Sequence, residues 1–338
     1  MPEDTSSKPT EKDERRWERW FWENTYHHSD FSDLDHLLQR KREQDYSISV
    51  GLPTLNEEDT IGEIVDVIQG KMIDHSGLVD ELVVVDSNSS DNTRTIAEEK
   101  GATVYNTVDY RELTGFDKGK GINLWLSLYL MKGDVLCWVD ADIENFESKF
   151  IYGLLGPILL NDNVSFSKAF YERPIKIDGD LKPSGGGRVT ELTARPLLNV
   201  FFPELSYFIQ PLSGEFAGTR SILETIPYFT DYGVETGMLI DIAHEYGLNH
   251  IAQVDLDQRV HHNKPLSGLR KMAFRILQVV LLRARQRDRL SGEIGASEVL
   301  NLIGQKGKDL VLEKFKSEID EKPPMQDVSD YPFGSESE

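Results

Sequence analysis

The chain has 338 residues, and 39% of them are hydrophobic, which is enough for one large α/β domain or two smaller ones with a packed core. Because 58 Asp and Glu outnumber 37 Lys and Arg, the formal net charge is -21, and its field repels nucleic acid and anionic membrane surfaces. Neither is expected as a partner, and a phosphate ligand would need a local cluster of cations. Such acidity suits a cytoplasm of high salt, but a chain that is merely acidic has the same composition.

The single cysteine, Cys137, lies in an apolar run and excludes an internal disulfide, which is typical of a reducing cytosol. No apolar stretch reaches the ~20 residues that a membrane-spanning helix needs, and the N-terminus is charged rather than signal-like. We therefore expect a cytoplasmic protein that does not bind a membrane.

The two ends of the chain differ in composition from the part between them. Residues 1–45 begin with a charged tail and continue with aromatic and leucine residues at irregular helical spacings, which predicts one or two short helices packed on the main body. Residues 317–338 are rich in charge, Ser and Pro and contain few apolar residues. We expect a disordered acidic tail there.

Residues 46–150 alternate short apolar runs with amphipathic helical stretches. The predicted strands are 46–56, 80–93, 102–107 and 134–146, and the predicted helices are 57–72, 93–101 and 119–133. Strands that alternate with helices predict an α/β fold in which a mostly parallel central sheet has helices on both faces. In such a sheet, ligands bind at the carboxyl ends of the strands.

Residues 151–316 form a second half in which the alternation is less regular. The pattern predicts a helix at 234–247, a strand at 251–256 and a long apolar helix at 273–290. This last helix is more hydrophobic than a surface helix needs to be. Core packing and a homodimer contact explain that excess equally well.

Polar residues follow three of the predicted strands at the expected ligand-binding edge. Asp140 and Asp142 end a buried strand, and two carboxylates so close together repel each other unless a cation lies between them. Oxygen ligands suit Mg²⁺ or Mn²⁺, which usually share their shell with substrate phosphates, although Asp-x-Asp is also common in turns. The other strand ends, with Glu57 and with Asp86 and Ser87, either hold a base or ribose or simply cap the next helix.

Cationic residues occur at two further places that could contact a phosphate or a metal. Lys118 and Lys120 lie among glycines at a predicted helix start, where side chains and backbone N–H groups can reach a diphosphate. Neither a P-loop nor a dinucleotide GxGxxG motif is present. His261 follows an apolar strand and either completes the metal site or is a solvated histidine at a strand end.

The stretch KPSGGGRVTELTARP, residues 182–196, is either a flexible linker or an anion-binding loop. Its glycines permit close approach of the backbone, Arg188 supplies a charged fork of donors, and a helix expected from about Thr190 offers free N–H groups. These features suit one phosphate monoester. A linker, in contrast, would tolerate the loss of Arg188.

Seven motifs occur in order along the chain: PTLNEE, VVDSNSSD, GKG, DAD, GGGRVTEL, YGVETG and RVHHNKP. Together they resemble the glucosyl-3-phosphoglycerate synthases, glycosyltransferases of family 81 with a GT-A fold, over about residues 46–290. The resemblance implies a metal-dependent, retaining enzyme that transfers glucose from UDP- or GDP-glucose to the 2-hydroxyl of D-3-phosphoglycerate. Its product would be a precursor of glucosylglycerate, a compatible solute. Related enzymes transfer mannose from GDP-mannose to the same acceptor.

The resemblance also implies roles for individual residues. Residues 46–150 would be the nucleotide-sugar-binding half and residues 151–316 the acceptor-binding half. The donor site would comprise Pro53, Leu55, Glu57, Asp86, Ser87, Lys120, Asp140, Ala141, Tyr232 and Glu235. The acceptor site would comprise Gly187, Arg188, Val189, Thr190 and Asn263. The metal ligands would be Asp142, His261 and Asp140, and the catalytic residues Asp142, Glu235 and Lys120.

The sequence departs from the family pattern at three places near the expected site. Relatives often have Ser in place of Ala141, and arginines are common in place of His262 and Lys264. Retention by double displacement would need a carboxylate nucleophile, and the sequence supplies no convincing one. We therefore expect front-face attack, in which the leaving diphosphate takes the acceptor proton. A lipid-phosphate glycosyltransferase and a non-catalytic nucleotide- or metal-binding module are the remaining alternatives.

Overall fold

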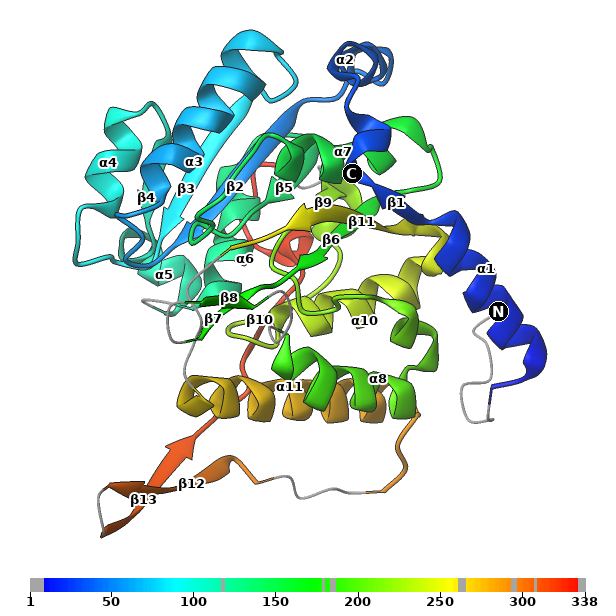
Figure 1. Cartoon of the computed structure of the whole chain (residues 1–338), viewed down its shortest axis with the longest axis vertical. Coiled ribbons are helices and arrows are strands. Elements are labelled where there is room, and N and C mark those ends of the chain that lie inside the picture. Colours follow the sequence, from blue (N-terminus) through cyan, green and yellow to red (C-terminus); the bar gives the residue numbers. More distant parts are fainter. Residues whose placement is uncertain are drawn as a thin grey trace.

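An eight-stranded sheet forms the centre of the protein in the computed structural model, which describes residues 9–116, 119–177, 180–182, 187–260, 266–292, 297–306 and 309–333. Its strand order is β1-β11-β6-β9-β5-β2-β3-β4 (Figure 1). The strands are β1 (Thr25–His27), β2 (Ile48–Thr54), β3 (Glu81–Asp86), β4 (Thr103–Asn106), β5 (Val135–Trp138), β6 (Phe166–Glu172), β9 (Phe216–Thr219) and β11 (Ile251–Gln258). Neighbours pair in parallel except at β9, which is antiparallel to β5 and β6. The predicted α/β fold with a mostly parallel sheet is confirmed.

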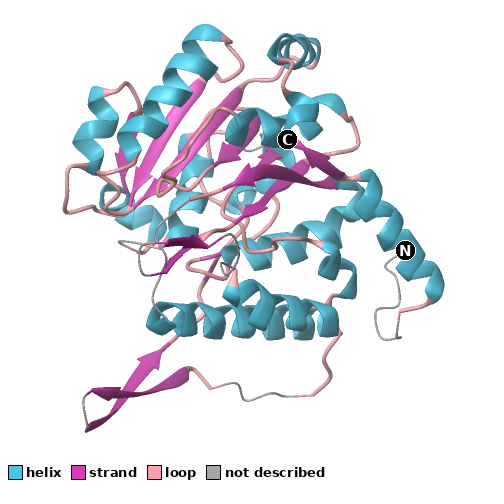
Figure 2. Cartoon of the chain, in the orientation of Figure 1, coloured by secondary structure: helices cyan, strands magenta, loops and turns pink. Residues whose placement is uncertain are grey.

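Helices cover both faces of this sheet (Figure 2). In β3, Leu82 and Val84 belong to one hydrophobic core and Val83 and Val85 to the other, because successive side chains of a strand point to opposite faces. The first core contains residues of α2 (Leu34–Glu43), α3 (Ile61–Val67), α4 (Thr93–Glu99) and α7 (Lys149–Leu160). The second contains residues of α6 (Lys120–Leu130), α8 (Arg195–Phe201), α10 (Val234–Tyr246) and α11 (Leu266–Gln286).

Smaller elements surround this three-layered body. Three two-stranded sheets are formed by β7 (Ile175–Ile177) with β8 (Asp180–Lys182), by β10 (Tyr228–Phe229) with β14 (Glu321–Lys322), and by β12 (Val299–Lys306) with β13 (Asp309–Lys316). The β12–β13 hairpin projects away from the rest of the chain (Figure 1). The remaining short helices include α5 (Arg111–Thr114) and α9 (Arg220–Leu223). No helix in the described part of the chain is long and apolar enough to cross a bilayer.

The N-terminal segment contributes a helix and also an edge strand. Helix α1 (Glu11–Glu23) begins at Thr10, whose side chain accepts a hydrogen bond from the backbone N–H of Asp13, and it buries Trp17 and Trp20. Strand β1 follows and pairs with β11 at the edge of the central sheet. The predicted short helices are therefore present, but the strand was not predicted.

Residues 317–333 are ordered, so the prediction of a disordered tail beginning at residue 317 is wrong for this part. Met325 is completely buried, and Tyr331 packs beside it in the same core cluster. The Arg220 guanidinium donates a hydrogen bond to the Tyr331 hydroxyl. A few apolar residues, too widely spaced to suggest an element, are enough to fix this segment because each enters a core that the rest of the chain has built.

Helix α11 begins at Leu266, earlier than the predicted residue 273. Its side chains Ile276, Val279, Val280 and Ala284 are buried in a core cluster with residues of α10 and α8. Core packing within one chain therefore accounts for its apolar character, and a homodimer contact is not needed to explain it.

Candidate active site

A cavity of about 690 Å³ opens at the carboxyl ends of β2, β3 and β5. The residues of the predicted site that line it are Pro53, Leu55, Glu57, Ser87, Lys120, Asp140, Ala141, Asp142, Gly187, Arg188, Val189, Thr190, Tyr232 and Glu235. Segments from both halves of the chain thus meet at the edge where ligands of a parallel sheet bind. A site built by both halves of the chain requires this placement. The roles of the individual residues stay predictions.

Three residues of the predicted site are not among those that line the cavity. One is buried behind it, and the other two lie outside the described residues. Asp86 is completely buried, and its carboxylate accepts hydrogen bonds from the Thr54 hydroxyl at 2.9 Å and the Ser89 backbone N–H at 2.7 Å. Asp86 thus lies behind the strand end and not in the cavity, and its assignment to the donor site stays a prediction. His261 and Asn263 lie outside the described residues.

Lys120, the first residue of α6, is held between two carboxylates. Its Nζ lies 2.8 Å from Asp140 Oδ1 and 2.8 Å from Glu235 Oε1, which come from the end of β5 and the first turn of α10. Burial alone would lower the pKa of Lys120, but the two negative charges outweigh burial and raise its pKa well above the usual value. Lys120 is therefore a permanent cation in the cavity.

Arg259 is a central residue of the site that the sequence analysis missed. Its Nη2 lies 3.0 Å from Asp140 Oδ2 and 2.5 Å from Asp142 Oδ1, and its Nη1 lies 3.3 Å from Glu215 Oε1. Burial works against its charge, but Glu215 and the neighbouring groups raise the pKa of Arg259 well above its usual value. The available sequence signal was an arginine directly after a strand of apolar alternation, a position where a buried charge needs acidic partners.

The pair Asp140 and Asp142 suits a divalent cation. One oxygen of each carboxylate contacts the same atom, Arg259 Nη2, so the two groups already converge on one positive charge. Carboxylate oxygens are the ligands that Mg²⁺ and Mn²⁺ prefer. An ion bound by these residues would compete with Arg259 for the same oxygens.

Gly214 explains how Lys120 and Asp140 can meet in a crowded place. A Cβ atom at this position would lie 2.5 Å from one oxygen of Asp140 and would also collide with the Lys120 ammonium. Behind them, Lys168 is buried and donates a hydrogen bond to the Ser213 carbonyl at 2.7 Å. Burial lowers the pKa of Lys168 to about 8. The cluster around Lys120 and Asp140 thus has a second layer of residues that the sequence did not reveal.

Another wall of the cavity is formed by residues 187–190 together with helix α11, which contacts the adjoining segment η4. Gly187 has a φ of 76°, in the left-handed region that favours glycine, and the chain then enters the π-helical segment η4 (Thr190–Ala194). The apolar side chains Leu269, Met272 and Ile276 line the same wall. Arg188 therefore lies in one cavity with the Lys120 cluster, although the two are far apart in sequence.

Comparisons with known proteins agree with this geometry. Residues 49–214 match the glycosyl transferase family 2 profile. The chain is 46% identical over 307 residues to the glucosyl-3-phosphoglycerate synthase of Petrotoga mobilis, which covers 91% of this chain and 94% of that protein. The crystal structure of mannosyl-3-phosphoglycerate synthase from Rubrobacter xylanophilus matches with a TM-score of 0.82 at 37% identity, covering 91% of this chain and 97% of that one.

A further crystal structure is that of glucosyl-3-phosphoglycerate synthase from Mycobacterium tuberculosis in complex with Mn²⁺, UDP-glucose and phosphoglyceric acid. It matches with a TM-score of 0.77 at 37% identity and covers 90% of this chain and 98% of that one. The fold and the cavity at its strand ends define a glycosyltransferase of the GT-A type. With 46% identity over almost the full length of both chains, the relationship is closer than fold alone. The chain belongs to the family of the glucosyl-3-phosphoglycerate synthases.

Proposed function

We propose that this protein transfers glucose from UDP-glucose to the 2-hydroxyl of D-3-phosphoglycerate, with retention of the α configuration, to give glucosyl-3-phosphoglycerate. The observation that carries this proposal is the single cavity that joins the cluster of Lys120, Asp140 and Asp142 to residues 187–190. It offers one place for a sugar-nucleotide diphosphate and another for a second phosphate. The relative from Mycobacterium tuberculosis has been crystallised with UDP-glucose and phosphoglyceric acid, and also with UDP, glucosyl-3-phosphoglycerate and Mn²⁺.

On the donor side, the nucleoside would lie against the ends of β2 and β3, which present Pro53, Leu55, Glu57 and Ser87. Lys120 would contact the diphosphate, and Tyr232 and Glu235 would hold the sugar. Asp140 and Asp142, with His261, would hold Mg²⁺ or Mn²⁺. When bound, that ion stabilises negative charge on the leaving diphosphate.

On the acceptor side, Arg188 would pair with the phosphate of 3-phosphoglycerate, and the backbone of Gly187, Val189 and Thr190 would surround it. Asn263 would lie near both substrates. The apolar wall of α11 supports this division, because Leu269 and Met272 offer the acceptor phosphate no competing charge. Orientation of the acceptor then depends on Arg188.

The arrangement favours front-face attack. Glu235 lines the cavity but is ion-paired with Lys120, which lowers its nucleophilicity, and Glu215 is completely buried, so we expect neither carboxylate to form a bond to the sugar. In the proposed step the bond from the anomeric carbon to the diphosphate oxygen breaks, and the bond to the acceptor oxygen forms on the same face. The leaving diphosphate takes the proton of the acceptor hydroxyl, and the protein contributes orientation and electrostatic stabilisation.

A donor panel tests the proposal. Purified protein with Mg²⁺ and 3-phosphoglycerate should transfer hexose fastest from UDP-glucose or GDP-glucose, and the product should show an α-anomeric proton by NMR. Release of nucleoside diphosphate that does not depend on 3-phosphoglycerate would contradict it. Because Glu235 is proposed to hold sugar hydroxyls, a Glu235→Gln variant that kept most of its activity would remove that role.

Mannosyl transfer from GDP-mannose is the second candidate. It is supported by the match to the Rubrobacter xylanophilus structure, whose TM-score of 0.82 exceeds the 0.77 of the mycobacterial complex. The donors of the two candidate reactions, GDP-mannose and UDP-glucose, differ in the configuration of the sugar 2-hydroxyl and in the base. Faster transfer from GDP-mannose than from either glucose donor would decide for this candidate.

A homodimer and a cytoplasmic location are further proposals. Leu192 and Val200, on η4 and α8, are 78% and 70% exposed, which supports a contact between two copies at this surface. The chain has a single, buried cysteine, Cys137, and therefore no internal disulfide, which suits a reducing compartment. Light scattering of wild type and a Leu192→Glu, Val200→Glu variant tests the dimer, and a monomeric wild type would exclude it.

A further inference from the structure

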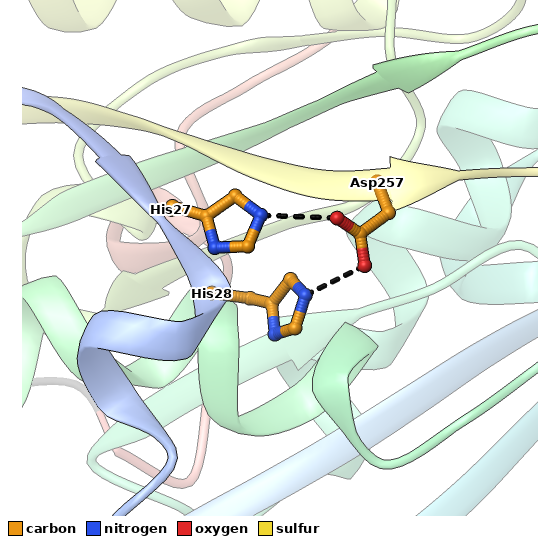
Figure 3. A group of neighbouring side chains, drawn as sticks. All are labelled: His27, His28 and Asp257. Atoms are coloured by element: carbon orange, nitrogen blue, oxygen red, sulfur yellow. Dashed lines mark hydrogen bonds and ion pairs between the residues drawn. The ribbon is translucent and has the colours of Figure 1, made fainter.

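A second group of polar side chains gathers at the carboxyl end of the edge strand β1, and none of its members lines the cavity. His27 ends β1, His28 begins the short helix η1 (His28–Phe31), and Asp257 lies in β11 (Figure 3). His27 Nε2 is 3.0 Å from Asp257 Oδ1, and His28 Nε2 is 2.7 Å from Asp257 Oδ2. Both rings thus direct the same nitrogen toward one carboxylate.

The backbone places Asp257 for this contact. A β-bulge interrupts the pairing of β11 with β6 between Asp255 and Gln258, and Asp257 has a φ of 65° there. The bulge turns the Asp257 carboxylate toward His27 and His28. Parallel pairing of β1 with β11 sets His27 opposite Asp255, which brings the two histidines to the same level. The cluster therefore results from the register of the sheet and not from chance contact on a surface.

Each member of the cluster has an outer hydrogen-bond partner. His27 Nδ1 lies 2.7 Å from the Ser29 hydroxyl, and His28 Nδ1 lies 3.2 Å from the Tyr152 hydroxyl. Lys149 Nζ donates to Asp257 Oδ2 at 2.7 Å, and together with the histidines it holds the pKa of Asp257 well below its usual range. Metal-binding histidines are normally oriented as His28 is, with the second ring nitrogen beside a hydrogen-bond acceptor and the first directed at the ion. His27 Nδ1, in contrast, accepts a hydrogen bond from the Ser29 backbone N–H.

The spacing and the type of the inner atoms suit a transition metal. In a tetrahedral zinc site with bonds of about 2.1 Å, neighbouring ligand atoms lie about 3.4 Å apart. The nitrogen–oxygen distances of 3.0 and 2.7 Å in the cluster would therefore lengthen by only a few tenths of an ångström when an ion binds. All three ligand atoms lie within 4.8 Å of one another. Two imidazoles and a carboxylate favour Zn²⁺, Ni²⁺ or Co²⁺, whereas Mg²⁺ prefers the all-oxygen environment of Asp140 and Asp142.

We propose that His27, His28 and Asp257 form a second metal site, selective for a transition-metal ion such as Zn²⁺ and separate from the cavity. Among the described residues this is the one group of at least three His, Cys, Asp or Glu side chains whose ligand atoms converge. Asp257 is 46% exposed and His27 44%, so solvent can supply the remaining ligands. In the bound state the His28 Nδ1–H donates to the Tyr152 hydroxyl, and His27 changes tautomer and loses the hydrogen bond that its Nδ1 accepts from the Ser29 backbone N–H. Asp257 binds the ion through Oδ1, and Lys149 stays on Oδ2.

The site would join the N-terminal segment to the strand that carries Arg259. Asp257 precedes Arg259 by two residues, and His27 and His28 belong to the first strand and its following turn. A bound ion would cross-link two segments more than two hundred residues apart. The site is tested by metal binding and not by catalysis, so the result does not depend on the proposed glucosyl transfer.

The experiment is a Zn²⁺ titration of the full chain against a chromophoric chelator, with Mg²⁺ and UDP in excess to occupy the cavity. Wild type should bind one Zn²⁺ more per chain than a His27→Gln, His28→Gln variant, and each single variant should bind that ion at least tenfold more weakly. Glutamine keeps an amide donor for Asp257 and so preserves the hydrogen bonds without the imidazole. His75→Gln, at an exposed histidine outside the cluster, is the matched control and should behave as wild type.

Equal Zn²⁺ stoichiometry and affinity in wild type and the double variant would overturn the proposal. A measurement on wild type alone covers the case in which the variants fold poorly. X-ray absorption of the Zn²⁺-loaded, Mg²⁺- and UDP-saturated protein should show two imidazole ligands for each zinc. One imidazole or none would also overturn it.

Discussion

The donor side and the acceptor side of the cavity are built from different kinds of structure. On the donor side, Lys120 begins a helix and Asp140 follows a buried strand, and ion pairs of 2.8 Å fix Lys120 to Asp140 and Glu235. On the acceptor side, Gly187 leads directly into a helical stretch, in which Val189 and Thr190 are buried but the Arg188 side chain is exposed. A buried side chain held by two ion pairs has less rotamer freedom than a long exposed one. If the proposed roles hold, the leaving group is bound by the rigid half of the cavity, and the acceptor phosphate by the more adaptable half, where the Arg188 side chain is exposed.

The strongest test of the rigid half is Arg259→Met. This change leaves the buried Glu215 and the pair of aspartates without their shared counter-charge, and we expect a loss of about 3 to 5 kcal/mol in the free energy of unfolding. Urea denaturation measures it. Arg173→Met is the matched control, because Arg173 also contacts the Tyr171 hydroxyl but is only half-buried. A loss below about 1 kcal/mol for Arg259→Met would mean that the cluster does not stabilise this side.

Asp142→Asn should reduce kcat by roughly a thousandfold, because the amide keeps the shape but removes the charge that is proposed to hold the ion. The residual rate should respond weakly to Mn²⁺ concentration, which steady-state kinetics over a Mn²⁺ series would show. Unfolding by urea serves as the control for a merely structural effect. A kcat within tenfold of wild type would count against Asp142 as a metal ligand.

Lys168→Met tests the second layer through pH. The pKa of Lys168 is about 8 in the folded protein and 10.5 in an unperturbed lysine, so between these pH values the unfolded chain binds a proton that the native chain does not. Stability of wild type relative to Lys168→Met should therefore be constant below pH 8 and rise by about 3 kcal/mol between pH 8 and 10.5. Lys71→Met, at an exposed lysine, should show no such rise. A flat difference across this window would show that Lys168 titrates normally.

Arg188→Ala tests the adaptable half and should have the smallest effect on the whole enzyme. Loss of a charge-assisted fork should raise the KM for 3-phosphoglycerate roughly ten- to hundredfold, while the KM for the sugar nucleotide changes little. Initial rates with each substrate varied in turn measure both constants. Arg188→Lys keeps the charge without the fork, so its KM for 3-phosphoglycerate should lie between those of wild type and Arg188→Ala. Equal changes in both KM values would remove the distinction between donor and acceptor sides.

The sequence predicted the layered α/β fold and the family because both depend on local patterns. Alternating strands and helices are visible in windows of ten to fifteen residues, and the polar strand ends at Glu57, Ser87 and Asp140 follow directly from them. Those ends do meet in one cavity. Their contacts with substrates stay predictions.

The parts that sequence did not predict depend on partners far away in the chain. Strand β1 has only three residues, too few for a periodic signal, and it becomes a strand because β11 offers a free edge. Arg259 is buried only because three carboxylates from other segments surround it. The burial of Asp86 was not predicted either, because a polar strand end that faces the cavity and one that faces the next turn have the same local sequence.

The pairing of β1 with β11 also has a consequence for biosynthesis. Thr25 and Gln253 are 228 positions apart, and the first strand of the sheet leaves the ribosome long before its partner. At ordinary rates of translation the interval is roughly 10 to 45 s. During that time Trp20 and the edge of β1 have no strand to pack against, so the nascent N-terminal segment is the part of this chain that we expect chaperones to meet first.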